Sequence, residues 1–234
     1  MEPRERLILP LDVDNADSAL RLVETLNPHV GAFKVGLELV NAAGTAIFQQ
    51  LRDAGAERIF YDAKFHDIPN TVAGAARAAA RHGLWMINVH AAGGSRMICA
   101  AATALRESGS IPPMLIGVTL LTSIAPDEMR DELQIPLKPT DYVASLASMV
   151  KESGGQGVVA SPHEIESVRE SCGPDFVIVS PGVRPKGADS GDQRRTMTPG
   201  EAVRLGADYL VIGRPITAAP NPVESVSRIL NEIE

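Results

Sequence analysis

The chain has few of the features that mark secreted, zinc-binding or membrane proteins. It contains only two cysteines, Cys99 and Cys172, which lie far apart and form no C-x-x-C pair. Neither a disulfide framework nor a zinc site is therefore expected. The first residues do not form a basic segment followed by a long apolar stretch, and no apolar run is long enough to span a bilayer. These absences predict a cytoplasmic protein with no membrane partner.

The chain also lacks an excess of basic residues. Its formal net charge is -7 and its pI is near 5.3, which argues against a surface that covers nucleic acid. The 234 residues are 44% hydrophobic and 22% charged, as in an ordinary globular protein. No stretch resembles an interdomain linker, so we predict one domain spanning residues 1–234.

Short apolar runs alternate with amphipathic segments along the whole chain. The runs predict eight strands, at residues 7–13, 32–35, 58–62, 85–90, 114–120, 157–160, 176–180 and 209–212. The segments between them predict helices, among them residues 16–26, 42–54, 71–81, 95–107 and 145–153. This alternation predicts a parallel sheet covered by helices. Eight repeats favour a closed (β/α)8 TIM barrel over the alternative, an open doubly wound sheet.

The third predicted strand ends in a dense group of charges. Asp62, Lys64 and Asp67 follow an apolar run within six residues, and Pro69 then favours the start of a helix. If residues 58–64 are extended, Asp62 and Lys64 project from the same face because strand side chains alternate. The charges therefore lie where a strand ends and a loop begins, which is where α/β proteins place active sites.

Polar residues also follow the other predicted strands, and a barrel would bring them to one rim. They are Asp12, Lys34, His90, Thr122, Ser123, Arg184, Gly213 and Arg214. The loops after strands seven and eight of many barrels bind phosphate at the start of a short helix. We therefore expect a phosphorylated small molecule as the ligand, with Arg184, Gln193 and Arg214 as hydrogen-bond donors and Gly213 allowing close approach of the anion. The turn-rich residues 186–195 predict a mobile loop over this site.

Each of these residues has a structural explanation when it is considered alone. Asp12 is typical of a helix N-cap, and Lys34 of a lysine that extends to solvent. Arg184 and Arg214 are compatible with surface ion pairs. His90 has no companions at metal-ligand spacing, so no metal site is expected. Their shared position on one rim favours function over these separate explanations.

Several motifs together resemble those of the orotidine 5′-monophosphate decarboxylase family. The resemblance covers nearly the whole chain, and the third strand carries its most specific part, because Phe65-His66 and Ile68-Pro69-Asn70-Thr71 extend a D-x-K-x-x-D motif that sugar-phosphate enzymes share. The motifs are Leu11-Asp12-Val13, Phe33-Lys34-Val35-Gly36, Tyr61 to Thr71, Asn88-Val89-His90-Ala91, Val118 to Ser123, Ser180 to Pro185, Gly191 to Arg195 and Val211 to Ile216.

The resemblance implies a cofactor-free barrel that forms a homodimer with shared active sites. Lys34, Asp62 and Lys64 would come from one protomer and Asp67 from the other, with Lys64 stabilising a carbanion at C6 of the substrate and then protonating it. The remaining implied contacts are Asp12 to the ribose hydroxyls, Ile68 and Thr71 across the interface, Thr122 or Ser123 to the pyrimidine, Pro181 to the substrate, and Arg184, Gln193, Gly213 and Arg214 to the phosphate.

Two other functions remain open at this stage. A Mg²⁺-dependent sugar-phosphate decarboxylase or synthase would share the barrel and the D-x-K-x-x-D motif, but such enzymes carry acidic ligands where this chain has Lys34 and His90. A non-catalytic sensor of a phosphorylated ligand would share the scaffold. Such a sensor has little reason to hold alternating charges at one point.

Overall fold

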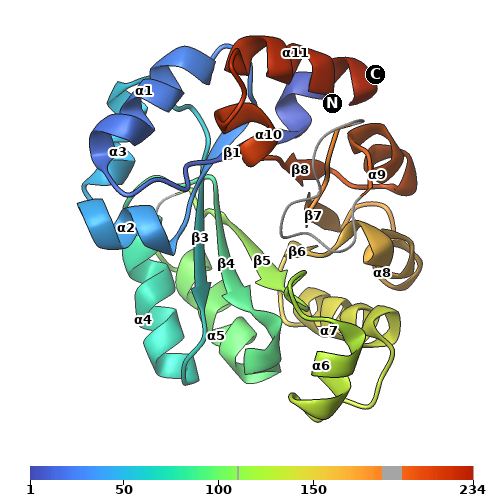
Figure 1. The fold of residues 1–234 in the computed structure, drawn as a ribbon. Coiled ribbons are helices and arrows are strands. Elements are labelled where there is room, and N and C mark those ends of the chain that lie inside the picture. Colours follow the sequence, from blue (N-terminus) through green and yellow to red (C-terminus); the bar gives the residue numbers. More distant parts are fainter. Residues whose placement is uncertain (110, 186–196, 234) are drawn as a thin grey trace.

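The computed structural model describes residues 1–109, 111–185 and 197–233. Eight parallel strands follow one another around a closed barrel, in which β1 pairs with both β2 and β8 (Figure 1). The strands are β1 (Leu7–Pro10), β2 (Ala32–Val35), β3 (Ile59–Phe65), β4 (Met86–His90), β5 (Met114–Val118), β6 (Gly157–Val159), β7 (Val177–Pro181) and β8 (Tyr209–Val211). The predicted (β/α)8 barrel is therefore confirmed.

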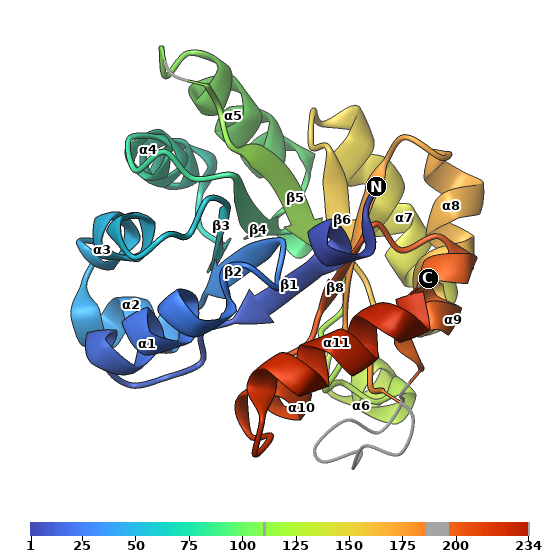
Figure 2. The ribbon, with the colours of Figure 1, turned by 90° about the horizontal axis from the view of Figure 1, so that it is seen from above.

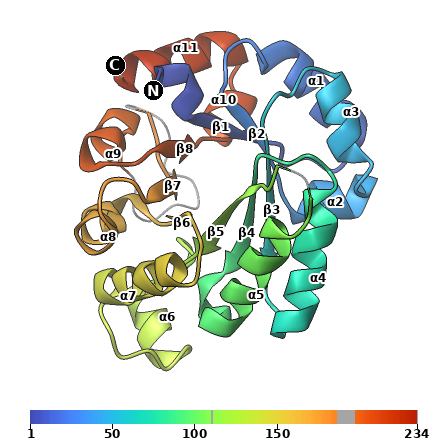
Figure 3. The same ribbon diagram turned by 180° about the vertical axis from the view of Figure 1, so that it is seen from behind.

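Helices surround the barrel on its outer side, as the front and back views show (Figures 1 and 3). The α-helices are α1 (Ala16–Leu26), α2 (Leu37–Ala43), α3 (Ile47–Asp53), α4 (Pro69–Ala80), α5 (Ser95–Arg106), α6 (Pro126–Asp131), α7 (Pro139–Glu152), α8 (Ile165–Cys172), α9 (Pro199–Leu205), α10 (Arg214–Thr217) and α11 (Pro222–Ile233). Short 3-10 helices are η1 (Pro3–Arg6), η2 (Ala91–Gly93) and η3 (Pro162–Glu164). No helix in the described ranges is long and apolar enough to cross a membrane.

The two ends of the chain meet beside the first and last strands. Helix α11 packs against η1 and α1, so both termini lie on the same side of the barrel (Figure 2). Helices α6 and α10 follow the carboxyl ends of β5 and β8, and both lie at the opposite end of the barrel from the α5–β5 connection (Figure 2). These two helices mark the mouth where the strands end.

Alternating side chains on the strands build two separate hydrophobic cores. On β4, Met86 points into the barrel and packs in a small inner core with Ile8, Phe60 and Ile116. Its neighbour Ile87 points outward into the larger core between strands and helices. Each such buried side chain stabilises the fold by about 1.5–3 kcal/mol. The rigid barrel wall that results positions the residues of the mouth.

The expected helix over residues 42–54 is wrong. Two helices occupy this region, because α2 ends at Ala43 and α3 begins at Ile47. Gly44 separates them with a φ of 70°, a left-handed conformation that glycine adopts at low cost and that ends a helix. The ends of two strands differ from the prediction by three residues. Strand β1 stops at Pro10, whereas β3 continues to Phe65 and carries the charged segment.

Strand β3 is irregular where the charges begin. Tyr61 pairs with Ile87 and Phe65 pairs with Val89, so residues 62–64 lie opposite Asn88 alone. Lys64 has a φ of 51°, which few residues other than glycine adopt. The strand therefore bulges at its carboxyl end, at the mouth of the barrel.

Candidate active site

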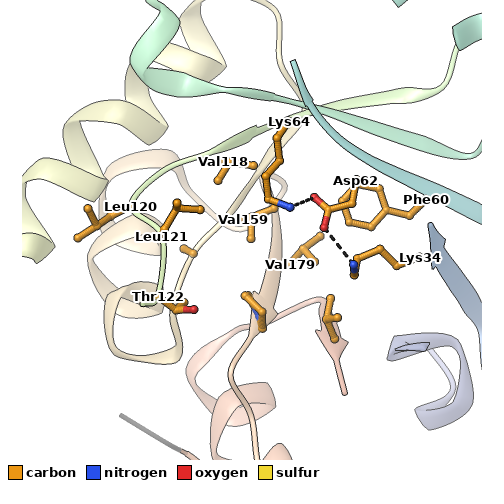
Figure 4. A pocket seen from close by; sticks show the side chains of 13 residues that line it. Lys34, Phe60, Asp62, Lys64, Val118, Leu120, Leu121, Thr122, Val159 and Val179 are labelled. Atoms are coloured by element: carbon orange, nitrogen blue, oxygen red, sulfur yellow. Dashed lines mark ion pairs between the residues drawn. The ribbon is translucent and has the colours of Figure 1, made fainter. Parts of the chain in front are cut away.

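Three charged side chains on β2 and β3 meet inside the mouth. The Nζ atom of Lys64 lies 2.7 Å from Oδ1 of Asp62, and the Nζ atom of Lys34 lies 3.1 Å from Oδ2 of the same carboxylate. Figure 4 shows both ammonium groups directed at Asp62. The expectation that Asp62 and Lys64 share one side of the strand is confirmed. A regular extended strand is not the reason, however, because Lys64 lies in the bulge.

Asp12 extends this group of charges. Its Oδ1 atom lies 3.2 Å from Nζ of Lys34, so the order of charges is Asp12, Lys34, Asp62 and Lys64. Only 12% of the Lys34 and Asp62 side chains is exposed, compared with 61% for Asp12. Within one chain the fourth member of this alternating array is thus Asp12, because Asp67 has no ion pair among the described residues.

The pairing in the array outweighs the effect of burial on its two inner charges. Burial on its own lowers the pKa of Lys34, but the carboxylates of Asp62 and Asp12 more than offset this, and the pKa is raised. Burial likewise favours a higher pKa for Asp62, but Lys34, Lys64 and a hydrogen bond from Asn88 lower the pKa overall. Both groups are therefore held in their charged forms.

A cavity of about 190 Å³ opens beside the array. Lys34, Asp62 and Lys64 form one wall, while most of the other lining residues are apolar (Figure 4). The lining consists of Lys34, Phe60, Asp62, Lys64, Val118, Leu120, Leu121, Thr122, Val159, Ala160, Val179, Pro181 and Val211. Charges that face a largely apolar cavity interact strongly with a bound ligand, because little water screens them.

Of three further residues predicted to contact the substrate, two line this cavity and one does not. Thr122 and Pro181 both line it. Ser123 is exposed and is absent from the lining, although it is adjacent in sequence. Of the two residues considered for contact with a base, Thr122 is thus the one that reaches the cavity.

Three of the predicted phosphate-binding residues are described, namely Arg184, Gly213 and Arg214; they follow β7 and β8 and do not line the cavity. Arg184 is 9% exposed, and its Nη1 donates a hydrogen bond to the carbonyl of Val183. Gly213 immediately precedes α10, the short helix expected after the eighth strand, and Arg214 is the first, exposed residue of that helix. A Cβ at Gly213 would lie 2.8 Å from Cγ of Pro10, so contact with β1 itself requires glycine there. Gln193 and the expected loop at residues 186–195 lie outside the described residues.

The residues expected to act across an interface lie at the start of α4 and face solvent. Asp67, Ile68 and Thr71 are all exposed, and Ile68 has an exposed fraction of 67%. The carboxylate of Asp67 accepts a hydrogen bond from the backbone N–H of Ile68 at 2.6 Å. Within one chain these three residues are not brought to the cavity.

The chain is similar to proteins of one family over nearly its full length. Residues 5–229 match the model of the orotidine 5′-phosphate decarboxylase / HUMPS family. The orotidine 5′-phosphate decarboxylase of Moorella thermoacetica is 53% identical, with all of this chain aligned to 94% of that protein. That of Syntrophomonas wolfei is 47% identical over the whole of both chains. The chain belongs to the orotidine 5′-phosphate decarboxylase / HUMPS family.

A solved structure agrees with this family membership. The crystal structure of orotidine 5′-phosphate decarboxylase from Lactobacillus acidophilus superimposes with a TM-score of 0.85 at 39% sequence identity, covering 97% of this chain and 98% of that one. This chain and that enzyme therefore share the same barrel fold.

One polar residue of the candidate site in this chain, Asn88, was not assigned a role from the sequence. Asn88 is completely buried on β4, and its side chain contacts both Asp62 and the backbone of Lys64. A usable signal was present, because Met86, Asn88 and His90 occupy alternate positions on a strand whose Met86 faces the barrel interior. A polar residue at such a position needs hydrogen-bond partners.

Proposed function

We propose that the chain decarboxylates orotidine 5′-monophosphate to uridine 5′-monophosphate and CO2, as a step of pyrimidine biosynthesis and without a cofactor. The observation that carries this proposal is the carboxylate of Asp62 held between two ammonium groups at the wall of the cavity. Relatives that are 45–53% identical and bear the decarboxylase name support it. We infer that the single domain of residues 1–234 carries the whole activity.

Lys64 supplies the electrostatic stabilisation and the proton. Loss of CO2 from C6 leaves an electron pair in an sp² orbital that the ring π system cannot delocalise. An ammonium group fixed beside C6 stabilises this charge, and its proton then replaces the carboxylate on carbon. The 2.7 Å pair with Asp62 supports this role, because it restricts where the Lys64 ammonium can lie.

Asp62 and Lys34 orient Lys64 and balance its charge. Each oxygen of the Asp62 carboxylate pairs with a different ammonium group, which fixes the carboxylate as well as both lysines. The carboxylate of a bound substrate would approach Asp62, and the repulsion between the two anions would make a secondary contribution by raising the energy of the ground state. Preorganisation of the charges is the main contribution of the array.

The rest of the substrate extends from the array toward the loops after β7 and β8. Asp12, exposed beside Lys34, would accept hydrogen bonds from the ribose hydroxyls. Thr122 would contact the edge of the pyrimidine, and Pro181 would pack against the substrate, because both line the cavity. The phosphate would be bound by Arg184, Gln193, Gly213 and Arg214. Binding energy from the distant phosphate can raise the rate by holding the reacting group in place.

The positions of the ammonium groups favour this reaction over a Mg²⁺-dependent one. A divalent cation of this kind prefers carboxylate oxygens that are free to coordinate it. Both oxygens of Asp62 are already paired with Lys34 and Lys64, and Oδ1 also accepts a hydrogen bond from Asn88. The array therefore suits an anionic substrate next to ammonium groups. A non-catalytic sensor would gain nothing from two lysines that share one buried carboxylate.

The active form is a homodimer in which Asp67, Ile68 and Thr71 complete the site of the neighbouring protomer. Asp67 has no ion pair in the described ranges and is exposed at the start of α4. Exposed Ile68 beside it provides apolar surface of the kind that a protein interface buries. A second copy of the chain would supply the negative charge that is missing on the far side of Lys64.

The activity is tested with the purified protein and orotidine 5′-monophosphate, whose ultraviolet absorbance changes on loss of CO2. We expect turnover that is the same with and without a chelator. No change in absorbance under either condition would refute the decarboxylase proposal, and turnover that a chelator abolishes would favour the Mg²⁺-dependent alternative.

Shared sites are tested by mixing two inactive variants, Lys64→Ala and Asp67→Ala. Half of the randomly assorted dimers would be hybrids with one intact site, so about one quarter of wild-type activity is expected to return. The matched control mixes Lys64→Ala with Asp62→Ala, which both damage the same half of the site. Absence of recovery in the first mixture would show that Asp67 acts in its own chain.

A further inference from the structure

Asn88 makes two contacts that join the backbone of Lys64 to the carboxylate of Asp62. Its Oδ1 atom accepts a hydrogen bond from the backbone N–H of Lys64 at 2.7 Å. Its Nδ2 atom donates to Oδ1 of Asp62, also at 2.7 Å. The same Asp62 oxygen pairs with Nζ of Lys64. Asn88, Asp62 and Lys64 thus form a closed ring of contacts, in which Lys64 takes part through both its backbone N–H and its Nζ atom.

The ring occurs where the pairing between β3 and β4 is interrupted. Residues 62–64 lie opposite Asn88 alone, and a bulge of this kind leaves backbone groups without ladder partners. The Asn88 side chain provides the acceptor that the Lys64 N–H would otherwise lack. It also faces a residue whose φ of 51° is uncommon for a side chain of this size. Such a conformation persists only where the surroundings hold it.

Only asparagine among residues of this size fits both contacts. The carboxylate of Asp62 needs a donor, and the Lys64 N–H needs an acceptor, so an amide satisfies both at once. Asn88 is completely buried, and loss of either contact would leave a buried polar group without its partner. An aspartate here would keep the acceptor but bring a second negative charge against Asp62.

We propose that Asn88 is a positioning residue for catalysis: it holds the bulged end of β3 so that the Lys64 ammonium and the Asp62 carboxylate keep their reactive placement. This inference rests on the proposed decarboxylase function. Asn88 acts through Lys64 and Asp62, so its loss lowers kcat much more than it weakens binding of the phosphate-bearing part of the ligand. A displacement of about 1 Å in a reacting group is enough to lower the rate about 100-fold.

The test uses Asn88→Asp and Asn88→Ala with orotidine 5′-monophosphate as substrate and uridine 5′-monophosphate as a non-reacting binding probe. We expect kcat to fall about 100-fold in both variants, while the Kd of the probe changes less than about threefold. Ser180→Ala is the matched control. Ser180 is also completely buried on a strand and donates to the carbonyl of Ala160 at 3.0 Å, but no hydrogen bond or ion pair among the described residues joins it to the array. Its kcat should stay at the wild-type value.

A pH profile separates positioning from a general loss of packing. In Asn88→Asp the new carboxylate lies against Asp62, so one proton binds to the pair more readily than to either acid alone. The protonated pair restores a donor toward Asp62 and keeps the acceptor for Lys64. Relative to wild type at each pH, kcat of Asn88→Asp should therefore rise as the pH falls, whereas Asn88→Ala should not recover. The wild-type comparison corrects for the other titratable groups that interact with Asp62, namely Lys34, Lys64 and His90.

The possible results are distinguishable. A kcat within threefold of wild type in both variants would overturn the inference, and so would parallel losses of kcat, probe affinity and thermal stability without recovery at low pH. An inactive wild-type protein would instead refute the proposed function itself. Because the Kd of the probe and the unfolding midpoint do not depend on turnover, they show in every case whether a variant is folded.

Discussion

The two ends of the barrel are built in opposite ways. At the mouth, charged side chains are held in largely desolvated positions, and Lys64 adopts an uncommon backbone conformation. At the other end, Trp85 and Tyr209 meet edge to face with ring centroids 5.0 Å apart, and the guanidinium of Arg58 lies 5.2 Å from the Trp85 ring. The charged groups at the mouth need support from the surrounding structure, whereas the aromatic and cation–π contacts at the other end stabilise the barrel.

This difference separates chemistry from stability along the barrel axis. The inner core lies between the two ends, and its apolar residues keep the barrel wall rigid. A rigid wall can hold a bulge and buried charges at one edge because the rest of the structure determines where they lie. Changes at the mouth should therefore act mainly on turnover. Changes at the end that holds Trp85 and Tyr209 should act on the free energy of unfolding.

Asp62→Asn at the mouth is expected to lower turnover strongly. The amide keeps the shape of the side chain but removes the negative charge that lies between Lys34 and Lys64. Two ammonium groups would then face each other without their shared counter-ion, and kcat should fall by about 10²–10³-fold. Steady-state rates of wild type and variant, taken at a temperature where both are folded, measure this fall in kcat. A rate close to wild type would show that the array does not depend on its central charge.

Trp85→Ala tests the end of the barrel opposite the mouth. The ring is partly exposed, so we expect the free energy of unfolding to fall by about 2–3 kcal/mol, somewhat less than for a fully buried tryptophan. The kcat of the folded variant should remain close to the wild-type value, because Trp85 lies at the end remote from the cavity. Urea denaturation and steady-state kinetics on the same preparation provide both quantities. A large fall in kcat would contradict the separation of the two ends.

Strain at the bulge is tested by comparing Lys64→Gly with Lys64→Ala. Glycine in a strand is ordinarily less stable than alanine by about 0.5–1 kcal/mol. The φ of 51° at residue 64 should reverse this order, because only glycine adopts a left-handed conformation freely. We expect the glycine variant to be about 0.5–1 kcal/mol more stable in urea denaturation. If alanine is the more stable of the two, Lys64 is not strained.

A smaller effect of pH is expected from His90, next to the array. Its partial burial and the nearby charges of His66 and Lys64 lower the pKa of His90, with Asp62 opposing them. The unfolded chain therefore takes up a proton more readily than the folded protein. This contribution to stability is complete above about pH 6.5 and is lost as the pH falls through the lowered pKa.

Replacement of His90 by Gln should reduce the loss of unfolding free energy between neutral and acidic pH. The difference between His90→Gln and wild type should be below about 0.5 kcal/mol, since solvent screens a half-buried group. Denaturation midpoints measured across this range would detect it. Identical pH profiles for the two proteins would show that His90 is not responsible.

Local patterns predicted the architecture well where packing follows the period of the sequence. Helix α1 and strand β2 have the predicted limits, because an amphipathic repeat capped by Asn15 and a short apolar run leave little choice. Strand β3 was predicted, but neither its continuation to Phe65 nor its bulge was. The bulge depends on pairing with β4, which is distant in sequence, and Lys64 carries no local signal for a left-handed conformation.

The sequence predicted which residues form the candidate site more completely than it predicted the contacts between them. Lys34, Asp62 and Lys64 meet as expected, since parallel strands bring their carboxyl ends to one rim. The contact between Asp12 and Lys34 was not expected, and neither was the role of Asn88. Both depend on side-chain directions across neighbouring strands, and spacing along one chain does not determine these.

The most direct test of catalysis at the mouth is turnover of orotidine 5′-monophosphate by Lys64→Ala at saturating substrate, compared with wild type. Lys64 is proposed both to stabilise the carbanion and to donate the proton, so the two losses should combine to at least about 10⁴-fold in kcat. The variant should still fold, because the barrel core is untouched. Turnover within a few-fold of wild type would contradict the assignment of Lys64 and, with it, the proposed mechanism.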